Sequence, residues 1–130
     1  MTVLNFLAAV NGVAQLYAAD GQFLGVLSSN LYDLNSICNP NGIYGSSWGI
    51  FSIRNPYSLY GSTYGIYSPY NPNSINPPVI WYQGQPMLVV TKNSNVLTNG
   101  LPIIDPDLVL GIYGQLANTA PNPTTAYWTL

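Results

Sequence analysis

The chain has 130 residues, enough for one domain with a hydrophobic core, and only 5% of them are charged, where soluble domains carry about 25%. Two basic residues cannot neutralise a run of phosphates, which argues against a nucleic-acid partner. The hydrophobic content of 48% argues against disorder. A surface with so few charges is either wetted by uncharged polar side chains or covered by other subunits.

The first segment, residues 1–12, is mostly apolar. No Lys or Arg precedes the apolar run, so the charged start of a signal peptide is missing. The run is also too short to span a bilayer, which needs about 20 residues, and we expect no membrane span. The segment is predicted to be an extended arm or a short helix, docked on its own core or on a neighbouring subunit. The residues assigned to such a subunit interface are Val3, Leu4, Phe6, Leu7 and Val10.

Residues 13–30 predict a β-hairpin. Asp20-Gly21 lies between two apolar runs, and glycine accepts the positive φ that a tight hairpin turn requires. Residues 78–115 predict a second hairpin around Gly84, followed by strands at 101–104 and 108–113. The two hairpins share a short pattern at an offset of 63 residues, which indicates either a duplication or a chance match.

Residues 31–77 form a repeat block rich in Asn, Pro, Gly, Ser and Tyr. Its units begin with Asn-Pro and follow one another every 16 residues, which suggests one small structural unit used repeatedly. The stretches 48–52 and 64–68 are predicted to be short strands, and a disordered low-complexity tract is the competing interpretation. The units begin at Asn39, Asn55 and Asn71.

Bulky side chains keep their register between the units, and this favours ordered packing within or between repeats. An exposed aromatic ring beside Asn or Gln also suits carbohydrate, so Tyr44 and Tyr60 carry an alternative prediction of glycan binding. The residues assigned to repeat packing are Tyr44, Trp48, Ile50, Tyr60, Tyr64 and Ile66.

The last segment, residues 116–130, contains a Pro-rich stretch and is predicted to be an extended tail. Tyr127 and Trp128 are large rings that a free tail rarely exposes, so both are assigned to the subunit interface. No helix is predicted after residue 12. The predicted fold is therefore a single all-β domain, residues 1–130, of short antiparallel strands and hairpins.

Groups that could perform catalysis are scarce. The chain has no His, which removes the commonest general base and metal ligand. Asp105 and Asp107 could bind Ca²⁺, although a Pro-centred turn at the start of a strand is the simpler interpretation. Asp20 and Asp33 are predicted to stabilise turns. Cys38 is either a small semi-buried residue or one half of an intermolecular disulfide.

Residues 21–80 resemble a family of small, uncharacterised bacterial repeat proteins that is frequent in cyanobacteria. The matching segments are Gly21–Asn30, Asp33–Ile37, the units from Asn39 and Asn55, and Pro77–Ile80. The resemblance implies an exported or surface-associated β-rich protein and carries no established activity. Family members are richer in charge, whereas Ile43 and Leu59 precede Tyr-Gly-Ser here. This difference favours a surface that is covered.

Together these features predict a structural, non-enzymatic subunit of an extracellular or cell-surface homopolymer, such as a filament, tube or sheath, without cofactor or metal. Its partner would be further copies of the same chain. The N-terminal segment could add to a neighbour's sheet edge, as in donor-strand complementation. The alternative is a cell-surface carbohydrate-binding module, and an enzyme would have to rely on Asp105 and Asp107 alone.

Overall fold

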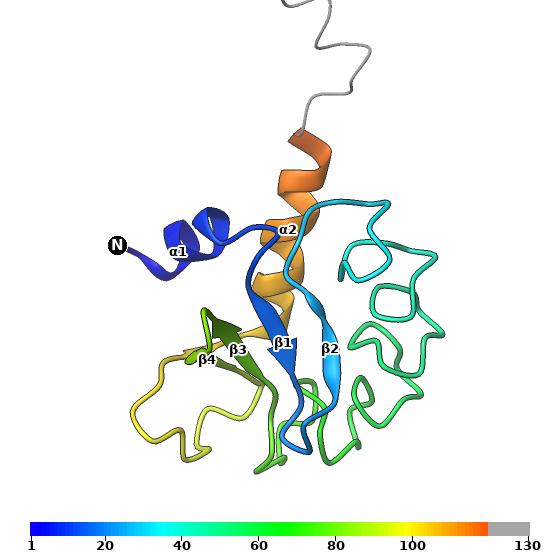
Figure 1. Cartoon of the computed structure of the whole chain (residues 1–130). Helices are drawn as coiled ribbons and strands as arrows, with labels where there is room; N and C mark the ends of the chain where they lie inside the picture. Colours follow the sequence, from blue (N-terminus) through cyan, green and yellow to red (C-terminus); the bar gives the residue numbers. More distant parts are fainter. Residues whose placement is uncertain (120–130) are drawn as a thin grey trace, which may run out of the picture.

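The computed structural model describes residues 1–119, without the side chain of Thr119. Its centre is a five-stranded sheet in the order β2-β1-β3-β4-β5 (Figure 1). The pair β4–β5 is parallel, and the other neighbouring strands are antiparallel. The elements are α1 (Val3–Ala9), β1 (Gln15–Tyr17), β2 (Phe23–Val26), β3 (Val79–Tyr82), β4 (Gln85–Val90), β5 (Ile103–Ile104) and α2 (Pro106–Thr119).

The all-β prediction is wrong, because the sheet is mixed and two helices accompany it. The main error is at residues 108–113, which belong to α2 and form no strand. Pro106 stands where a helix tolerates proline best, and the Asp105 carboxylate accepts the N–H of Asp107 at 2.8 Å, as a helix cap does. Val109 and Tyr113 lie four residues apart and are both fully buried. Residues 116–119 continue this helix, so the predicted extended tail begins too early.

The N-terminal segment is a short helix and forms no extended arm. The Thr2 hydroxyl caps α1 by accepting the N–H of Asn5 at 3.1 Å. Leu7 and Val10 are buried in the chain's own core, and the Leu7 carbonyl accepts the hydroxyl of Tyr113 at 2.6 Å. The segment therefore belongs to its own subunit, and donor-strand exchange would remove part of the core.

Both predicted hairpins are present. In the turn between β1 and β2, the Asp20 carboxylate accepts the N–H of Gln22 at 3.0 Å, which confirms its predicted turn role. In the turn between β3 and β4, Gln83 and Gly84 both have positive φ, as a two-residue type I′ turn requires. The outer edge of β2 is occupied, because the backbone of Val26 bonds to residues 35 and 37.

One hydrophobic core joins the sheet, both helices and the repeat block, from which Ile37, Ile53 and Tyr60 enter it. Alternation along the strands directs Leu16 and Ile80 into it and leaves Gln15 and Trp81 on the other face of the sheet. Fully or almost fully buried members are Leu7, Leu16, Leu24, Leu27, Ile37, Ile53, Ile80, Val90, Val109 and Tyr113.

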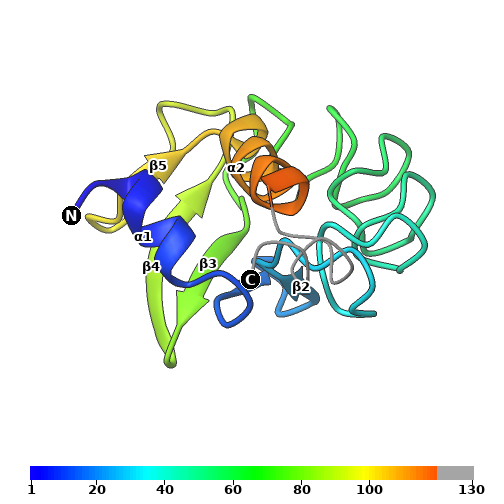
Figure 2. The same ribbon diagram turned by 90° about the horizontal axis from the view of Figure 1, so that it is seen from above.

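Residues 31–77, which we call the turn block, form an irregular coil on the side of the molecule away from α1 (Figures 1 and 2). The strands predicted at 48–52 and 64–68 are absent from it. Backbone bonds at those places link Gly49 to Ser52 and Gly65 to Ser68, which are turn bonds between residues three apart. The competing prediction of a disordered tract is not supported either, because side-chain hydrogen bonds close the turns of the block and Ile53 and Tyr60 are buried in the core.

Candidate functional site: two apolar surfaces

The turn block is held by small polar side chains, which are spaced three residues apart over residues 33–39, 52–58 and 68–74. In most of these turns a Ser, Asn or Asp oxygen accepts the N–H of the residue two places later. Asp33 does this for Asn35 at 2.9 Å, which confirms its predicted role. The side chains acting this way include Asp33, Ser36, Asn39, Ser52, Asn55, Ser58, Ser62, Ser68, Asn71 and Ser74.

The 16-residue spacing of Asn-Pro has a specific structural cause. Each of these Asn side chains donates from Nδ2, at 3.0 Å, to the carbonyl oxygen six residues earlier. The same asparagine therefore closes two neighbouring turns, one with Nδ2 and one with Oδ1. Close approach of the backbone also explains the glycines at 45 and 61, where a Cβ would clash with the carbonyl of Asn39 or Asn55.

A row of aromatic rings runs along the inner side of the turn block. Neighbouring ring centroids are 4.9 Å apart for Phe23 and Tyr44, 6.5 Å for Tyr44 and Phe51, and 6.1 Å for Tyr60 and Tyr67. Phe51 and Tyr60 are 6.0 Å apart, and Tyr17 of β1 extends the row at 5.3 Å from Phe23. Tyr44 and Tyr60 are thus packing residues, and Tyr60 is only 8% exposed. The buried ring of Tyr60 offers no stacking surface to a glycan.

Three further rows of large side chains point to solvent from the turn block. Their members are 16 residues apart, and each is between 47% and 90% exposed. Four residues assigned to repeat packing, Trp48, Ile50, Tyr64 and Ile66, belong to these rows and are exposed in the described subunit. We call them the outer rows: Tyr32, Trp48 and Tyr64; Leu34, Ile50 and Ile66; and Ile43, Leu59 and Ile75.

Sequence reasoning missed five members of the outer rows. Tyr32, Leu34 and Ile75 lie outside the two well-matched units, and Ile43 and Leu59 were noted only for the charge they replace. The signal that could have found them is the 16-residue spacing itself. Extending that spacing one step before the first unit reaches Tyr32 and Leu34, and extending it after the second reaches Ile75.

A second apolar surface lies at the α1 side of the molecule. Met1, Val3, Phe6 and Met87 line a groove there of about 230 Å³, which we call the α1 groove and which also includes Thr2, Leu88 and Pro102. Of the predicted interface residues, Val3 and Leu4 are exposed, whereas Leu7 and Val10 belong to the core. Phe6 is half-buried and contacts the ring of Tyr82 edge-on at 6.0 Å. Tyr127 and Trp128 lie outside the described residues.

The charged side chains are engaged within the subunit. Lys92 Nζ lies 2.8 Å from Asp105 and 2.7 Å from Asp107, which also accepts the hydroxyl of Tyr70 at 2.8 Å. These hydrogen bonds from Lys92 and Tyr70 hold the pKa of Asp107 below its usual range, and the two carboxylates raise the pKa of Lys92. Arg54 Nε donates to the Ile37 carbonyl at 2.8 Å.

This arrangement bears on the predicted possibility that Asp105 and Asp107 bind Ca²⁺. A lysine, not a shared cation site, lies between the carboxylates of Asp105 and Asp107. Within residues 1–119, no group of three or more His, Cys, Asp or Glu side chains is placed to hold a metal ion. The Asp20 carboxylate accepts the hydroxyl of Tyr60 at 2.7 Å, so this turn residue also anchors the turn block to the sheet.

Cys38 is a buried free thiol, only 7% exposed. Burial raises its pKa, although the nearby Arg54 acts in the opposite direction. The position agrees with the simpler prediction of a small packed side chain. An intermolecular disulfide there would require the first turns of the block to open.

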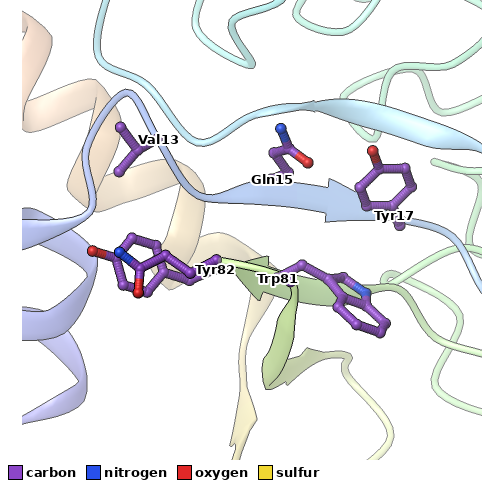
Figure 3. Close-up of a pocket in the computed structure, with 7 residues that line it drawn as sticks. Val13, Gln15, Tyr17, Trp81 and Tyr82 are labelled. Atoms are coloured by element: carbon purple, nitrogen blue, oxygen red, sulfur yellow. The ribbon is translucent and has the colours of Figure 1, made fainter.

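The face of the sheet that bears Gln15 and Trp81 is hollowed (Figure 3). Residues of β1, β3 and the following turn line a groove of about 570 Å³, which we call the sheet groove. The rings of Tyr17 and Trp81 lie at one end, with Gln15 beside them, and Tyr82 lies at the other end (Figure 3). The lining residues are Val13, Gln15, Tyr17, Trp81, Tyr82, Gln83 and Gly84, none of which is charged.

Comparison with known proteins leaves the site to be interpreted from its own geometry. No protein-family model matches the chain, and neither the curated proteins nor the solved structures contain a match. The resemblance to bacterial repeat proteins therefore stays a prediction. As to membranes, the part of the chain that the structure describes contains no helix long and apolar enough to cross a bilayer.

Proposed function

We propose that the chain is a structural subunit of an extracellular homopolymer, in which the outer rows of one copy pack on the α1 groove of the next. The observation that carries this proposal is the set of nine large side chains exposed in register on the turn block. A soluble monomer rarely exposes apolar side chains in such numbers over one region, and an extended apolar patch marks an interaction surface.

The position of the two apolar surfaces favours a chain of subunits over a closed pair. The helix α1, whose residues line the α1 groove, and the turn block lie on opposite sides of the body formed by the sheet and α2 (Figures 1 and 2). When one surface of a subunit contacts a different surface of the next copy, the contact repeats from copy to copy. It gives an open chain unless the rotation between neighbouring copies closes a ring. Head-to-tail packing therefore suits a filament or a tube.

The charge of the chain favours a second copy of itself as the partner. All six charged residues make bonds within the subunit, and the surfaces in question are apolar. Such surfaces give no electrostatic steering toward a charged partner and no repulsion between like copies. The extracellular location in this proposal rests on the resemblance to exported repeat proteins.

The magnitudes indicate an assembly that depends on concentration. Complete burial of a Leu or Ile side chain contributes about 1.5–3 kcal/mol, whereas association costs roughly 4–15 kcal/mol in lost freedom of motion. Burial of three or four side chains would only offset this cost. Each added subunit forms one new contact and meets the same association cost, so the length of the polymer should rise with protein concentration.

Electron microscopy and sedimentation of paired variants test the proposal. The row variant, Ile50→Ser with Ile66→Ser, removes apolar groups from the turn block. The groove variant, Val3→Asp with Leu4→Asp, places charge beside the α1 groove, and Asp in a first helical turn is compatible with α1. We expect polymers from the unmodified chain and dispersed 14.1-kDa subunits from either variant. Leu97→Ser, at a residue 94% exposed outside both surfaces, should polymerise normally.

A mixture of the two variants tests the head-to-tail geometry. The row variant retains an intact α1 groove, and the groove variant retains intact outer rows, so the mixture should form one-to-one dimers that grow no further. Failure of the mixture to associate, although each variant alone is folded, would indicate contact between like surfaces. Dispersed particles of the unmodified chain at every concentration would contradict the homopolymer itself.

A further inference from the structure

The sheet groove is a preformed site that shares no lining residue with either surface assigned to assembly, although its Tyr82 contacts Phe6 of the α1 groove. Strand alternation sends Leu16 and Ile80 to the core and presents Gln15, Tyr17 and Trp81 on the opposite face. Hydrogen-bonded strands hold these side chains, and the tight turn at Gln83-Gly84 closes one end. Groups carried on rigid strands keep a fixed spacing, so binding there costs little ordering of the backbone.

The chemistry of the groove combines aromatic faces with neutral amides. Tyr17 and Trp81 are half-buried, and the amide of Gln15 lies beside them (Figure 3). An aromatic ring has a negative face that attracts the weakly positive C–H bonds of a flat sugar ring. A glutamine amide can both donate to and accept from a hydroxyl group. The aromatic rings therefore complement the C–H face of a pyranose, and the amide complements its hydroxyl groups.

The ligand must be uncharged. None of the seven lining residues carries a charge, so an ionic group in the groove would lose its hydration without gaining a partner. The two basic residues of the chain are bonded elsewhere, Lys92 to Asp105 and Asp107 and Arg54 to the Ile37 carbonyl. Anionic polysaccharides and nucleic acids are therefore poor candidates for this groove.

From this geometry we propose that the sheet groove binds a neutral β-linked oligosaccharide, with a sugar ring stacked on Trp81 and Tyr17 and a hydroxyl group bonded to Gln15. This site differs from Tyr44 and Tyr60, whose rings pack inside the turn block. It would let an assembled layer hold a neutral polysaccharide while its assembly surfaces stay occupied. The proposal is independent of polymer formation, because it uses neither the outer rows nor the α1 groove.

Nuclear magnetic resonance of the indole N–H signals tests the site with all its lining residues in place. The groove variant keeps the subunit dispersed, and cellohexaose and chitohexaose serve as neutral β-linked probes. We expect the Trp81 signal to shift in a saturable way with at least one probe, while the signal of the exposed Trp48 stays unchanged. A charged galacturonate hexamer should leave both signals in place.

Two substitutions link the shift to the proposed contacts. Gln15→Ala changes an exposed strand residue and should weaken binding several-fold, and Trp81→Leu should weaken it about tenfold or more. Trp48→Ala removes a similar ring from the turn block and should leave the affinity unchanged. No shift of the Trp81 signal at 10 mM of either probe would overturn the proposal, as would a shift confined to Trp48. A Trp81 shift that follows protein concentration without sugar would assign the groove to subunit contact instead.

Discussion

The sheet and the turn block hold their backbones together in different ways. In the sheet, neighbouring strands satisfy one another's N–H and C=O groups, and apolar side chains are free to fill one common core. In the turn block, Ser and Asn side chains replace the neighbouring strand and close each turn locally. Such a coil is thin, so many of its large side chains have no interior to enter.

This difference explains why the two regions expose different kinds of side chains in different arrangements. The sheet exposes its aromatic residues beside amides, over one hollow. The turn block exposes rows of Ile, Leu, Tyr and Trp at the spacing of its own repeat, and an inner row of rings holds it to the body. The repeat therefore specifies two surfaces at once, a packed inner one and an apolar outer one.

The largest expected effect comes from substituting a buried isoleucine of a repeat unit, compared with an exposed isoleucine of the same unit. Ile53 is 1% exposed and Ile50 is 66% exposed, although they lie three residues apart. In the dispersed groove variant, Ile53→Ala should lower the free energy of unfolding by about 2–5 kcal/mol, because it leaves a cavity in the core. Ile50→Ala should change it by less than about 0.5 kcal/mol.

Chemical denaturation with urea measures both values. Equal losses for the two isoleucines would contradict the division into inner and outer sides. In the polymerising chain, Ile50→Ala has a different effect. It is expected to reduce assembly while each subunit stays folded.

A second contrast concerns the side chains that replace a neighbouring strand. Asn55 is 7% exposed, donates to the Gly49 carbonyl and accepts the N–H of Tyr57. Asn55→Ala removes both hydrogen bonds and leaves the N–H of Tyr57 without this acceptor, whereas the Gly49 carbonyl keeps the N–H of Ser52. The expected loss is about 2–3 kcal/mol. Asn73→Ala, at an exposed position of the same block, is the matched control and should cost less than about 0.5 kcal/mol.

Amide hydrogen exchange shows which residues lose stability in Asn55→Ala and by how much. Protection should fall mainly within the turn block for Asn55→Ala, because the strand ladder does not depend on this side chain. Uniform loss of protection across β1 to β4 would instead mean that the block and the sheet unfold as one unit.

The sequence allowed the sheet half to be predicted further than the turn block. Asp20-Gly21 and Gly84 fix hairpin turns through local backbone chemistry, and such signals need no knowledge of the rest of the fold. The helix α2 was missed because its β-branched and aromatic residues and two glycines resemble a strand, while the capping by Asp105 was interpreted as a turn. Tertiary packing of Val109 and Tyr113 overrides that local preference.

In the turn block, the period was visible but its physical meaning was not. A 16-residue spacing says that Asn39 and Asn55 have equivalent roles, yet bonds to carbonyls six residues earlier depend on the path of the coil. The same limit applies to Trp48 and Ile50. Both keep their register whether they point inward or outward, and only the fold distinguishes the two.

The smallest expected effect concerns the bond between the two regions at high pH. Burial, together with the hydrogen bond to Asp20, raises the pKa of Tyr60 to about 12 in the folded chain, above the value of about 10 expected when unfolded. The folded state therefore holds this proton more tightly, so the stabilisation is complete below pH 10 and is lost as the pH rises toward 12. Asp20 is exposed, and screening by water keeps the contribution modest.

The denaturation midpoint of the groove variant, measured from pH 9 to pH 12, tests this link. Burial also raises the pKa values of Cys38, Tyr70 and Tyr113, and Asp105 and Asp107 raise that of Lys92. The midpoint should therefore fall over this range even without Tyr60. Tyr60→Phe should make the fall less steep, because it removes one of the protons that the folded state holds more tightly than the unfolded state. Tyr57→Phe, at a ring 93% exposed, should leave the profile unchanged. An identical slope for Tyr60→Phe and the parent would mean that the Tyr60–Asp20 bond does not join the turn block to the sheet in solution.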